Sequence, residues 1–312
     1  MDMEYLLWLQ GLREASGNFF TPFMQLVSDI AAGELMLVPL FVYWCMSKRS
    51  GLMIIISFGI SKFINGVAKL TVCAYRPWIR DARIVPDAIA LKSAGGYSFP
   101  SGHTMDSAPV YGGLAVVARK RAVWVSWLCG IMIVLTALSR NYLGVHTPQD
   151  VVVGTLLALL SVYMGAKILS YIEAKPEREN FVYIAGLVLC VLALVYINVK
   201  SYPMDYVDGK LLVDPVSMAK HTYGNIGSFA GVIAAMFLER KYVRFTETGL
   251  NLKGIVLAVI GLGIYEFLRI TVGGELLKVL GGSWGRFVRN FSVIFFAVTV
   301  WPVVLKVFAG KE

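Results

Sequence analysis

Long apolar runs recur along the whole chain, and short polar segments separate them. Most runs hold roughly 17 to 25 residues, enough for a helix to cross about 30 Å of hydrocarbon. The third run is the shortest, and its helix must include a polar first turn to reach the length of a span. The pattern predicts nine membrane-spanning helices, near residues 28–46, 51–73, 104–118, 122–138, 149–172, 180–198, 221–238, 254–271 and 290–308.

The composition agrees with a membrane protein. Of the 312 residues, 57% are hydrophobic and 16% are charged, and the mean hydropathy is +0.67. These values lie far outside the usual range of soluble domains. The predicted fold class is therefore an all-α polytopic membrane protein.

Residues 1–21 form a separate N-terminal segment in this pattern. The stretch "MDMEYLLWLQGLREA" lacks the positively charged start and cleavable apolar core of a signal peptide, so we do not expect its removal. Its amphipathic sequence predicts an interfacial helix that lies flat on the membrane. Leu6, Leu7 and Trp8 are expected to reach the acyl boundary.

The net charge of +9 comes mainly from basic residues at the ends of spans. This distribution does not suit a nucleic-acid surface, and we expect no nucleic-acid partner. The basic loops "SKRS", "ARKRA", "KPERE" and "ERKYVR" all fall on one side, which the positive-inside rule assigns to the cytoplasm. The opposite side carries the N-terminus and segments 74–103, 139–148 and 199–220.

The sequence offers little to bind a metal ion. Its three histidines are dispersed, and its carboxylates are not clustered. The cysteines stand singly, without the spacing of a zinc site or a disulfide framework; they are Cys45, Cys73, Cys129 and Cys190. We expect neither a metal nor a cofactor.

The first polar segment on the outer side is "KLTVCAYRP". Lys69 and Arg76 are seven residues apart, so on a helix they lie on nearly the same face, about 10 Å apart along the axis. Pro77 turns the chain out of the helix. The two cations either anchor lipid headgroups by snorkelling or form part of a binding site.

The second segment is "PSGH", which precedes the third apolar run. Ser101 suits an N-cap, and Gly102 and His103 occupy the first turn of the following helix. A helix N-terminus offers free backbone N–H groups and the positive end of the helix dipole, which together bind anions. An ordinary turn and cap is the alternative.

The third segment is "SRNYLGVHTPQD". Arg140 closes the fourth span, and Thr147, Pro148 and Asp150 have the spacing of a capping box. That box does not explain His146, which precedes the cap where an apolar residue is usual. Asp150 is near enough to hold one imidazole nitrogen of His146, which would fix its tautomer and raise its basicity.

These three segments place cations, a helix N-terminus and two histidines at one membrane face. This set suits a tetrahedral dianion, because fixed cations and oriented amides stabilise the equatorial oxygens of a transferring phosphoryl group. One histidine can attack phosphorus while the other protonates the leaving oxygen.

The three motifs together resemble the signature of the type 2 phosphatidic acid phosphatase superfamily, which also includes glucose-6-phosphatases and vanadium haloperoxidases. Each motif alone is weak, but all three in order are highly specific. The matching positions are Lys69, Arg76, Pro77, Pro100, Ser101, Gly102, His103, Ser139, Arg140, His146 and Asp150.

The resemblance implies a six-helix phosphatase core over residues 22–175 and a phosphohistidine mechanism without divalent metal. His146 would be the nucleophile, oriented by Asp150, and His103 the general acid. The groups that would bind the phosphoryl oxygens are Lys69, Arg76, Ser101, the Gly102 amide and Arg140. Residues 176–312 lie outside the resemblance and add three predicted spans of unknown role.

The leading functional hypothesis is a phosphatase that acts on a lipid phosphate or pyrophosphate from the outer face of a cell membrane, and the compact chain suggests a bacterial inner membrane. Candidate substrates are undecaprenyl pyrophosphate, phosphatidic acid and phosphatidylglycerophosphate, with membrane lipids as surroundings. A lipid-linked phosphotransferase with the same phosphohistidine is the first alternative. A transporter or binding protein without chemistry is the second. The oligomeric state stays open.

Three further polar features lie within predicted spans. Glu266 and Arg269 have helical spacing and are expected to pair. Asp106, one turn after His103, either stabilises the helix start or shapes the leaving-group pocket. His221 is expected at a helix start, since only a loose echo of the "SGHT" segment surrounds it.

Overall fold

The computed structural model describes residues 2–32 and 34–309, and helices dominate this part of the chain. The chain begins with an amphipathic helix and a helical stretch in four pieces. These elements are α1 (Asp2–Ala15), α2 (Thr21–Ala32), η1 (Glu34–Met36), α3 (Leu37–Phe41) and η2 (Val42–Met46).

The central part of the bundle follows. Helix α4 packs against both α7 and α9, and α7 packs against α8. Two short helices lie in the long loop between α4 and α7. The bounds are α4 (Lys48–Val72), α5 (Pro77–Arg80), α6 (Ala88–Ser93), α7 (Gly102–Ala118), α8 (Val123–Tyr142) and α9 (Pro148–Ala174).

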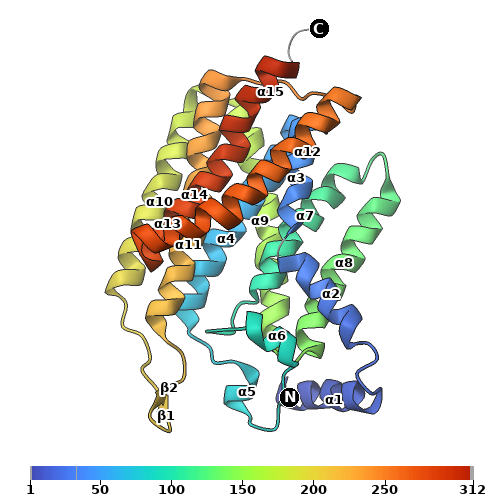
Figure 1. Cartoon of the computed structure of the whole chain (residues 1–312), viewed down its shortest axis with the longest axis vertical. Coiled ribbons are helices and arrows are strands. Elements are labelled where there is room, and N and C mark those ends of the chain that lie inside the picture. Colours follow the sequence, from blue (N-terminus) through green and yellow to red (C-terminus); the bar gives the residue numbers. More distant parts are fainter. Residues whose placement is uncertain (1, 33, 310–312) are drawn as a thin grey trace.

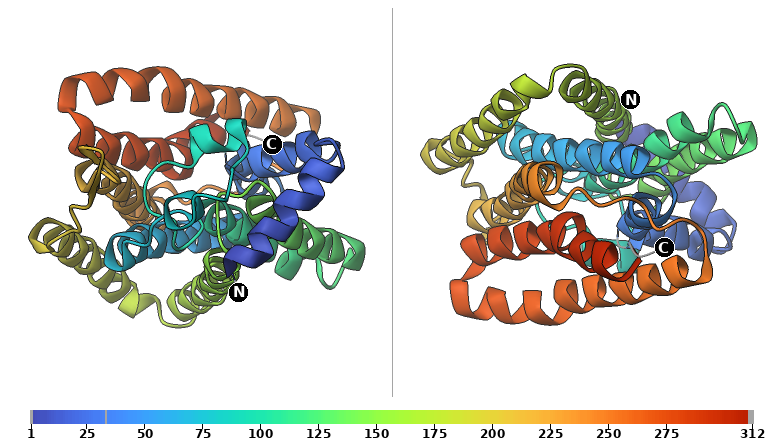
Figure 2. Two further views of the ribbon diagram at one scale, coloured as in Figure 1. Left: turned by 90° about the horizontal axis from the view of Figure 1, so that it is seen from below. Right: turned by 90° about the horizontal axis from the view of Figure 1, so that it is seen from above.

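The C-terminal part starts with η3 (Pro176–Arg178) and α10 (Glu179–Val199). A two-residue antiparallel hairpin follows, with Tyr206 opposite Leu211. Figure 2 shows that the last helices lie along one side of the bundle. The remaining elements are β1 (Tyr206–Val207), β2 (Lys210–Leu211), α11 (Pro215–Leu238), η4 (Glu239–Val243), α12 (Leu252–Phe267), η5 (Leu268–Val272), α13 (Gly273–Leu280), α14 (Gly282–Phe295), η6 (Phe296–Val300) and α15 (Trp301–Ala309).

Six continuous helical segments are long and apolar enough to cross a membrane, which confirms the all-α polytopic class. Each of them overlaps one of the nine predicted spans. They are Lys48–Arg80, Val123–Tyr142, Pro148–Ala174, Pro176–Val199, Leu252–Leu280 and Gly282–Phe308.

The other three predicted spans are also helical but differ from a simple apolar helix. The first is divided among α2, η1, α3 and η2. The third, α7, has 17 residues and contains Pro109. The seventh, α11, has 24 residues but carries Lys220, His221 and Asn225 in its first half. Polar groups within these three helices mark the part of the bundle where the functional residues gather.

The segment between the last two predicted spans, residues 272–289, is also helical. Helix α12 continues through η5 and α13, and the chain then reverses at Gly281 into α14. Gly281 has a φ of 77°, a backbone conformation that glycine adopts without steric cost. Since α13 is short and amphipathic, its sequence lacks the long apolar run that marks a span.

Helices α11 and α14 approach each other closely because glycines line the contact. A Cβ atom at Gly227 would lie 2.3 Å from the carbonyl oxygen of Phe287, and one at Gly231 would lie 2.8 Å from that of Phe291. Small residues at such spacing allow helix backbones to pack directly in membranes. Helix α11 also packs against α4, where Thr222 donates to the Gly66 carbonyl. The C-terminal helices therefore contact the residues of the motif-bearing bundle.

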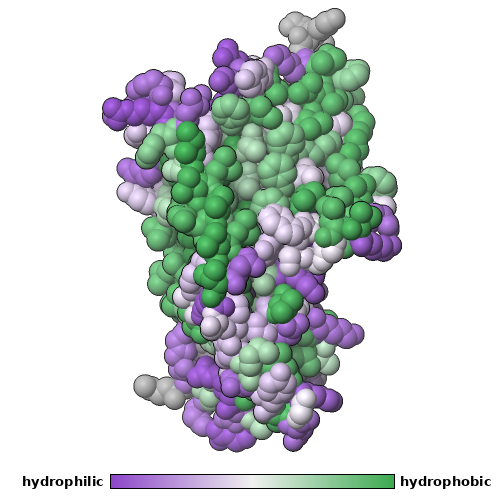
Figure 3. Space-filling view, turned by 90° about the vertical axis from the view of Figure 1, so that its left-hand side faces the viewer, coloured by the Kyte–Doolittle hydropathy of each residue, from purple (hydrophilic) through white to green (hydrophobic). Residues whose placement is uncertain are grey.

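The two ends of the molecule differ in character. Figure 1 places α1, α5, α6 and the hairpin at one end, and the C-terminus at the other. On the face shown in Figure 3, hydrophobic residues cover most of the upper part, and hydrophilic residues gather toward the lower end. The end that carries α5 and α6 is the one that the positive-inside rule assigns to the outer side.

Helix α1 forms as expected, but one of its apolar residues packs differently. Trp8 is exposed, whereas Leu6, which was expected to reach lipid, is buried within the protein. Arg13, at the end of the same helix, is buried and donates to the carbonyls of Val85 and Tyr142. Helix α1 is thus held against the loops at the motif-bearing end.

The start of α7 lies against α9 because Gly154 has no side chain. A Cβ atom there would lie 2.5 Å from Thr104 Oγ1 and 3.3 Å from the Ser101 carbonyl oxygen. The amide of Ser101 also donates to the Asp150 carbonyl over 3.0 Å. The second and third motifs therefore share one rigid contact.

We predict that Gly154→Leu lowers the thermal unfolding midpoint of the detergent-solubilised protein, because overpacking costs about 1–3 kcal/mol. Gly130→Leu is the matched control, since a Cβ atom at Gly130 meets nothing within 4 Å. Equal midpoints for the two variants would show that α7 and α9 are not closely packed.

Candidate active site

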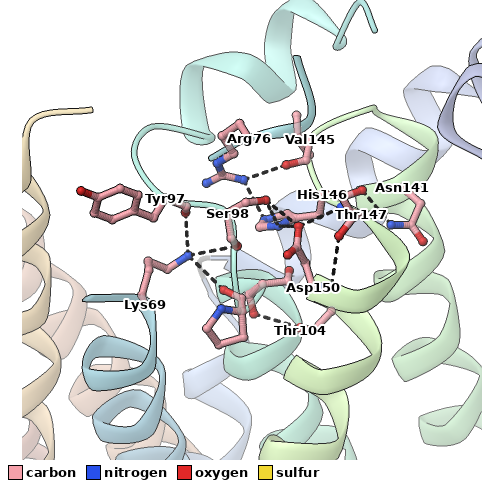
Figure 4. A network of polar contacts seen from close by, with 12 residues as sticks. Lys69, Arg76, Tyr97, Ser98, Thr104, Asn141, Val145, His146, Thr147 and Asp150 are labelled. Atoms are coloured by element: carbon pink, nitrogen blue, oxygen red, sulfur yellow. Dashed lines mark hydrogen bonds and ion pairs between the residues drawn. The ribbon is translucent and has the colours of Figure 1, made fainter. Parts of the chain in front are cut away.

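The three motifs meet around one cavity at the motif-bearing end of the bundle (Figure 4). The cavity has a volume of about 360 Å³. One wall comes from α4, the following loop, the start of α7 and the α8–α9 connection. The motif residues that line it are Lys69, Arg76, Gly102, His103, Arg140 and His146.

His146 is held from both ring nitrogens. Its Nδ1 lies 3.3 Å from Asp150 Oδ2, and its Nε2 lies 2.9 Å from Arg76 Nη1. A guanidinium only donates, so Nε2 accepts and the ring proton sits on Nδ1, facing Asp150. This arrangement gives Nε2 a lone pair on the cavity side of the ring, as a nucleophile requires.

Asp150 connects this histidine to the start of α9. Its Oδ2 accepts from the Ser98 hydroxyl over 2.5 Å and from the Thr147 amide over 2.8 Å. The Thr147 hydroxyl in turn accepts from the Asp150 amide, which confirms the predicted capping box. The carboxylate therefore caps the helix and orients the imidazole at the same time.

Lys69 and Arg76 bond mainly to backbone carbonyls. Lys69 Nζ donates to the carbonyls of Tyr97 and Pro100 over 3.1 and 3.0 Å. Arg76 donates to those of Gly96 and Val145. The sequence suggested direct phosphoryl ligands, whereas in this state the two cations hold the loop before α7 in place.

Arg140 and Ser101 present donors that are not otherwise used. The Arg140 side chain is fully buried, and its Nη1 contacts the Ser28 hydroxyl. Among the described residues, nothing hydrogen-bonds its Nε and Nη2, or the buried hydroxyl of Ser101. Ser101 is the N-cap residue by position, but its side chain does not cap α7 as the sequence suggested. A Cβ atom at Gly102, the next residue, would meet no atom within 4 Å, so the space beside this residue is open.

His103 lines the cavity from the first turn of α7. One turn later, Asp106 forms an ion pair with Lys62 of α4 at 2.7 Å. The ion pair joins two helices beside the site, and because Asp106 also lines the cavity, both alternatives for this residue stay open. The predicted pair of Glu266 and Arg269 is also confirmed.

The pKa of His146 is lowered well below its usual range. Burial is the largest cause, and the cations Arg76, Arg140 and Lys69 add to it. The expected effect of Asp150 on the basicity of this ring is not among the causes of the shift and stays a prediction. Desolvation and the three cations together keep the imidazole neutral at pH 7.

Several contacts of the site were not found from the sequence. Ser98 bonds to Asp150, and Asn141 donates to the His146 carbonyl over 2.9 Å. Ser28, from α2, contacts Arg140. Asn141 lies inside the third motif segment and Ser98 two residues before the second, and a polar residue at or beside a motif is a usable signal. Ser28 lies more than a hundred residues from its partner, and no pattern marks it.

The far wall of the cavity comes from α11, through Met218, His221, Thr222 and Asn225. His221 does not stand at the helix start as expected, since α11 begins at Pro215. No cluster of three or more His, Cys, Asp or Glu side chains occurs in the described part of the chain.

Residues 50–174 match the model of the PAP2 superfamily. This part of the chain is similar to that superfamily. The match confirms the resemblance that the motifs indicate, and it ends before η3 and the C-terminal helices.

Two curated relatives of this chain carry phosphatase names. The phosphatidylglycerophosphatase B of Bacillus subtilis (strain 168) is 35% identical over 121 residues, 36% of this chain and 55% of the relative. The undecaprenyl-diphosphatase of Sulfolobus acidocaldarius is 30% identical over 123 residues, 39% of this chain and 56% of the relative. The chain spans about half the length of the curated relatives it matches. No solved structure matches it significantly.

We predict that His146 is a neutral imidazole with its proton on Nδ1 at pH 7. Because its pKa is lowered, it stays neutral as the pH falls to about 6.5, the ordinary histidine value, and becomes protonated only below that. Nitrogen-15 NMR of histidine-labelled protein measures both properties, and the His146→Ala spectrum assigns the signals. A protonation midpoint at or above 6.5, or a proton on Nε2, would contradict the assignment.

Proposed function

We propose that this protein is a metal-independent phosphatase that hydrolyses a lipid phosphate or diphosphate through a phosphohistidine on His146. The observation that carries this proposal is the position of His146, between Asp150 and Arg76, with unused donors of Arg140 and Ser101 in the same site. The names of the two relatives support a lipid phosphate or diphosphate as the substrate class.

In the first step, His146 Nε2 attacks phosphorus and the bond to the leaving oxygen breaks. His103 acts as the imidazolium, a form that the negative charge of the bound phosphoryl group favours; it gives its proton to the leaving oxygen and becomes neutral. The Arg76 N–H that bonds to Nε2 in the free protein turns to a phosphoryl oxygen as the new N–P bond forms. Asp150 stabilises the positive charge that develops on the imidazole.

In the second step, water attacks phosphorus and transfers a proton to the neutral His103. The N–P bond breaks, phosphate leaves, and both histidines return to their starting states. Arg140, Ser101 and the amides at the start of α7 stabilise the equatorial oxygens in both steps. Lys69 contributes charge and keeps the loop carbonyls in position.

The place of the site supports an amphiphilic substrate. The cavity lies near the hydrophilic end of an otherwise apolar bundle (Figures 1 and 3). A lipid can therefore leave its chains in the bilayer while its headgroup enters the cavity. The basic loops at the other end support an extracytoplasmic position for this site, by the positive-inside rule.

The direct test is phosphate release by the purified protein in detergent with EDTA, across phosphatidic acid, phosphatidylglycerophosphate and undecaprenyl diphosphate. We expect release from at least one lipid by the wild type and a loss of more than about a thousandfold in His146→Ala. Ser126→Ala, on the distant half of α8, is a control expected to remain active.

Release that needs an added divalent cation would contradict metal independence. Phosphate transfer to an added lipid acceptor, without release in its absence, would favour the phosphotransferase alternative. Binding of the lipids by a folded protein with neither reaction would favour a binding protein.

Two substrates whose leaving groups differ in their need for a proton test the role of His103. We predict that His103→Ala slows hydrolysis of a lipid phosphate by about 10²–10⁴, because the alkoxide then leaves without a proton. Hydrolysis of p-nitrophenyl phosphate should fall far less, since nitrophenolate leaves readily unprotonated. His146→Ala is the control that should lose both reactions. Equal losses of both substrates in His103→Ala would exclude a proton transfer to the leaving oxygen as its main role.

A further inference from the structure

A second cavity adjoins the candidate active site. Its volume is about 390 Å³, and it shares Lys62 and Asp106 with the first cavity. Much of its remaining wall belongs to helices outside the family match, including Tyr265 of α12 and Arg289 of α14. The C-terminal helices thus enclose a space that opens from the site where the phosphoryl group would bind.

One side of this second cavity is cationic. Arg289 Nε donates to the amide oxygen of Asn290 over 3.0 Å, and no carboxylate of the described residues forms an ion pair with Arg289. The Asn290 amide is itself fixed on the Gly224 carbonyl over 3.0 Å. Arg269 also lines the cavity and is paired with Glu266. An anionic ligand would balance the Arg289 charge.

Another part of the lining is apolar. The side chains come from η1, α4, η5 and α14, and they suit the first carbons of lipid chains rather than a free ion. These residues are Leu35, Met36, Phe58, Ile270, Val293 and Ile294. The combination of a cation with apolar walls is typical of a site for the polar–apolar junction of a lipid.

Lys62 and Asp106 line both cavities and so mark the border between them, and the helical rise gives the distance from this border to residues of the candidate active site. Lys62 precedes Lys69 by seven residues on α4, which is about 10 Å along the helix. Asp106 follows Gly102 by four residues on α7, which is about 6 Å. The two phosphorus atoms of a diphosphate share one oxygen and are too close to occupy both cavities. Two phosphates joined by a short polyol fit this separation.

We propose that the second cavity binds a second phosphate of the substrate, separated from the scissile phosphate by a short polyol. This inference rests on the proposed phosphatase function and names its substrate class. The scissile monoester lies at His146, the second phosphate lies at Arg289, and the lipid chains leave along the apolar side. The C-terminal helices therefore select a glycerophospholipid with two phosphates over one with a single phosphate.

The ion pair of Lys62 and Asp106, which line both cavities, can bind the polyol that joins the two phosphates. Lys62 and Asp106 are about one-fifth exposed, so they remain reachable from the cavity. The Asp106 carboxylate can accept a hydrogen bond from a spacer hydroxyl, and Lys62 can donate to a phosphate oxygen on either side. A polyol with a free hydroxyl therefore bridges the two cavities with its polar groups paired.

The test compares Arg289→Gln with wild type on three substrates: phosphatidylglycerophosphate, phosphatidic acid and p-nitrophenyl phosphate. We expect KM for phosphatidylglycerophosphate to rise by about tenfold to a hundredfold with little change in kcat, because a charge-assisted contact to the bound lipid is lost. The other two substrates should change by less than about twofold. Lys278→Gln is the matched control. Lys278 forms an exposed ion pair on α13, the helix that precedes α14, and its replacement should leave the hydrolysis of all three substrates unchanged.

The outcomes separate this inference from the proposed function. Wild type that hydrolyses none of the three would contradict the phosphatase itself. Equal losses on all three substrates, or no loss on phosphatidylglycerophosphate, would overturn the second phosphate site while the phosphatase stands. An Arg289→Gln effect that appears only after phosphatidylglycerol is added to the micelles would assign the cavity to a neighbouring anionic lipid, and it too would overturn the inference.

Discussion

An excess of buried positive charge is the constraint on which the site depends. Lys69, Arg76 and Arg140 line one cavity, and the carboxylate among the motif residues, Asp150, bonds to His146 beside it. Buried cations are costly unless each is paired or hydrogen-bonded. The loop before α7 meets this need by turning its carbonyls toward Lys69 and Arg76. Among the described residues nothing hydrogen-bonds two nitrogens of Arg140, and a phosphoryl dianion would complete the charge balance there.

The same constraint explains the properties of His146. Desolvation and three neighbouring cations keep its ring neutral, and Arg76 and Asp150 fix which nitrogen carries the proton. Asp150 is in turn held by the capping box and by Ser98. The nucleophile is thus positioned by elements that also end one helix and begin another, so catalysis and folding use the same contacts.

The motif residues could be singled out from the sequence because each lies in a short segment with its own local pattern, and the structure brings several of them together around one cavity. The capping box, the family and the all-helical membrane fold were all predicted from such local patterns. Contacts between distant segments were not. Ser28 reaches Arg140 across 112 positions, and α11 supplies the far wall through residues that no motif marks. The α13–α14 hairpin was missed because amphipathic α13 does not resemble a span.

The C-terminal helices extend the region that is similar to the PAP2 superfamily. Glycines of α11 bring α14 close, and α11 lies on α4, so the extension encloses the space beside the motifs. In the proposed account, phosphoryl transfer takes place in the cavity that the motifs line, and the extension determines which headgroup fits beside it.

The most direct test of the account is rapid-quench mass spectrometry of the enzyme during turnover. We predict an acid-labile phosphoryl group on His146 that forms and decays fast enough to account for phosphate release. A phosphoryl group on another residue, or full turnover with no phosphoenzyme at any quench time, would contradict the central role of His146.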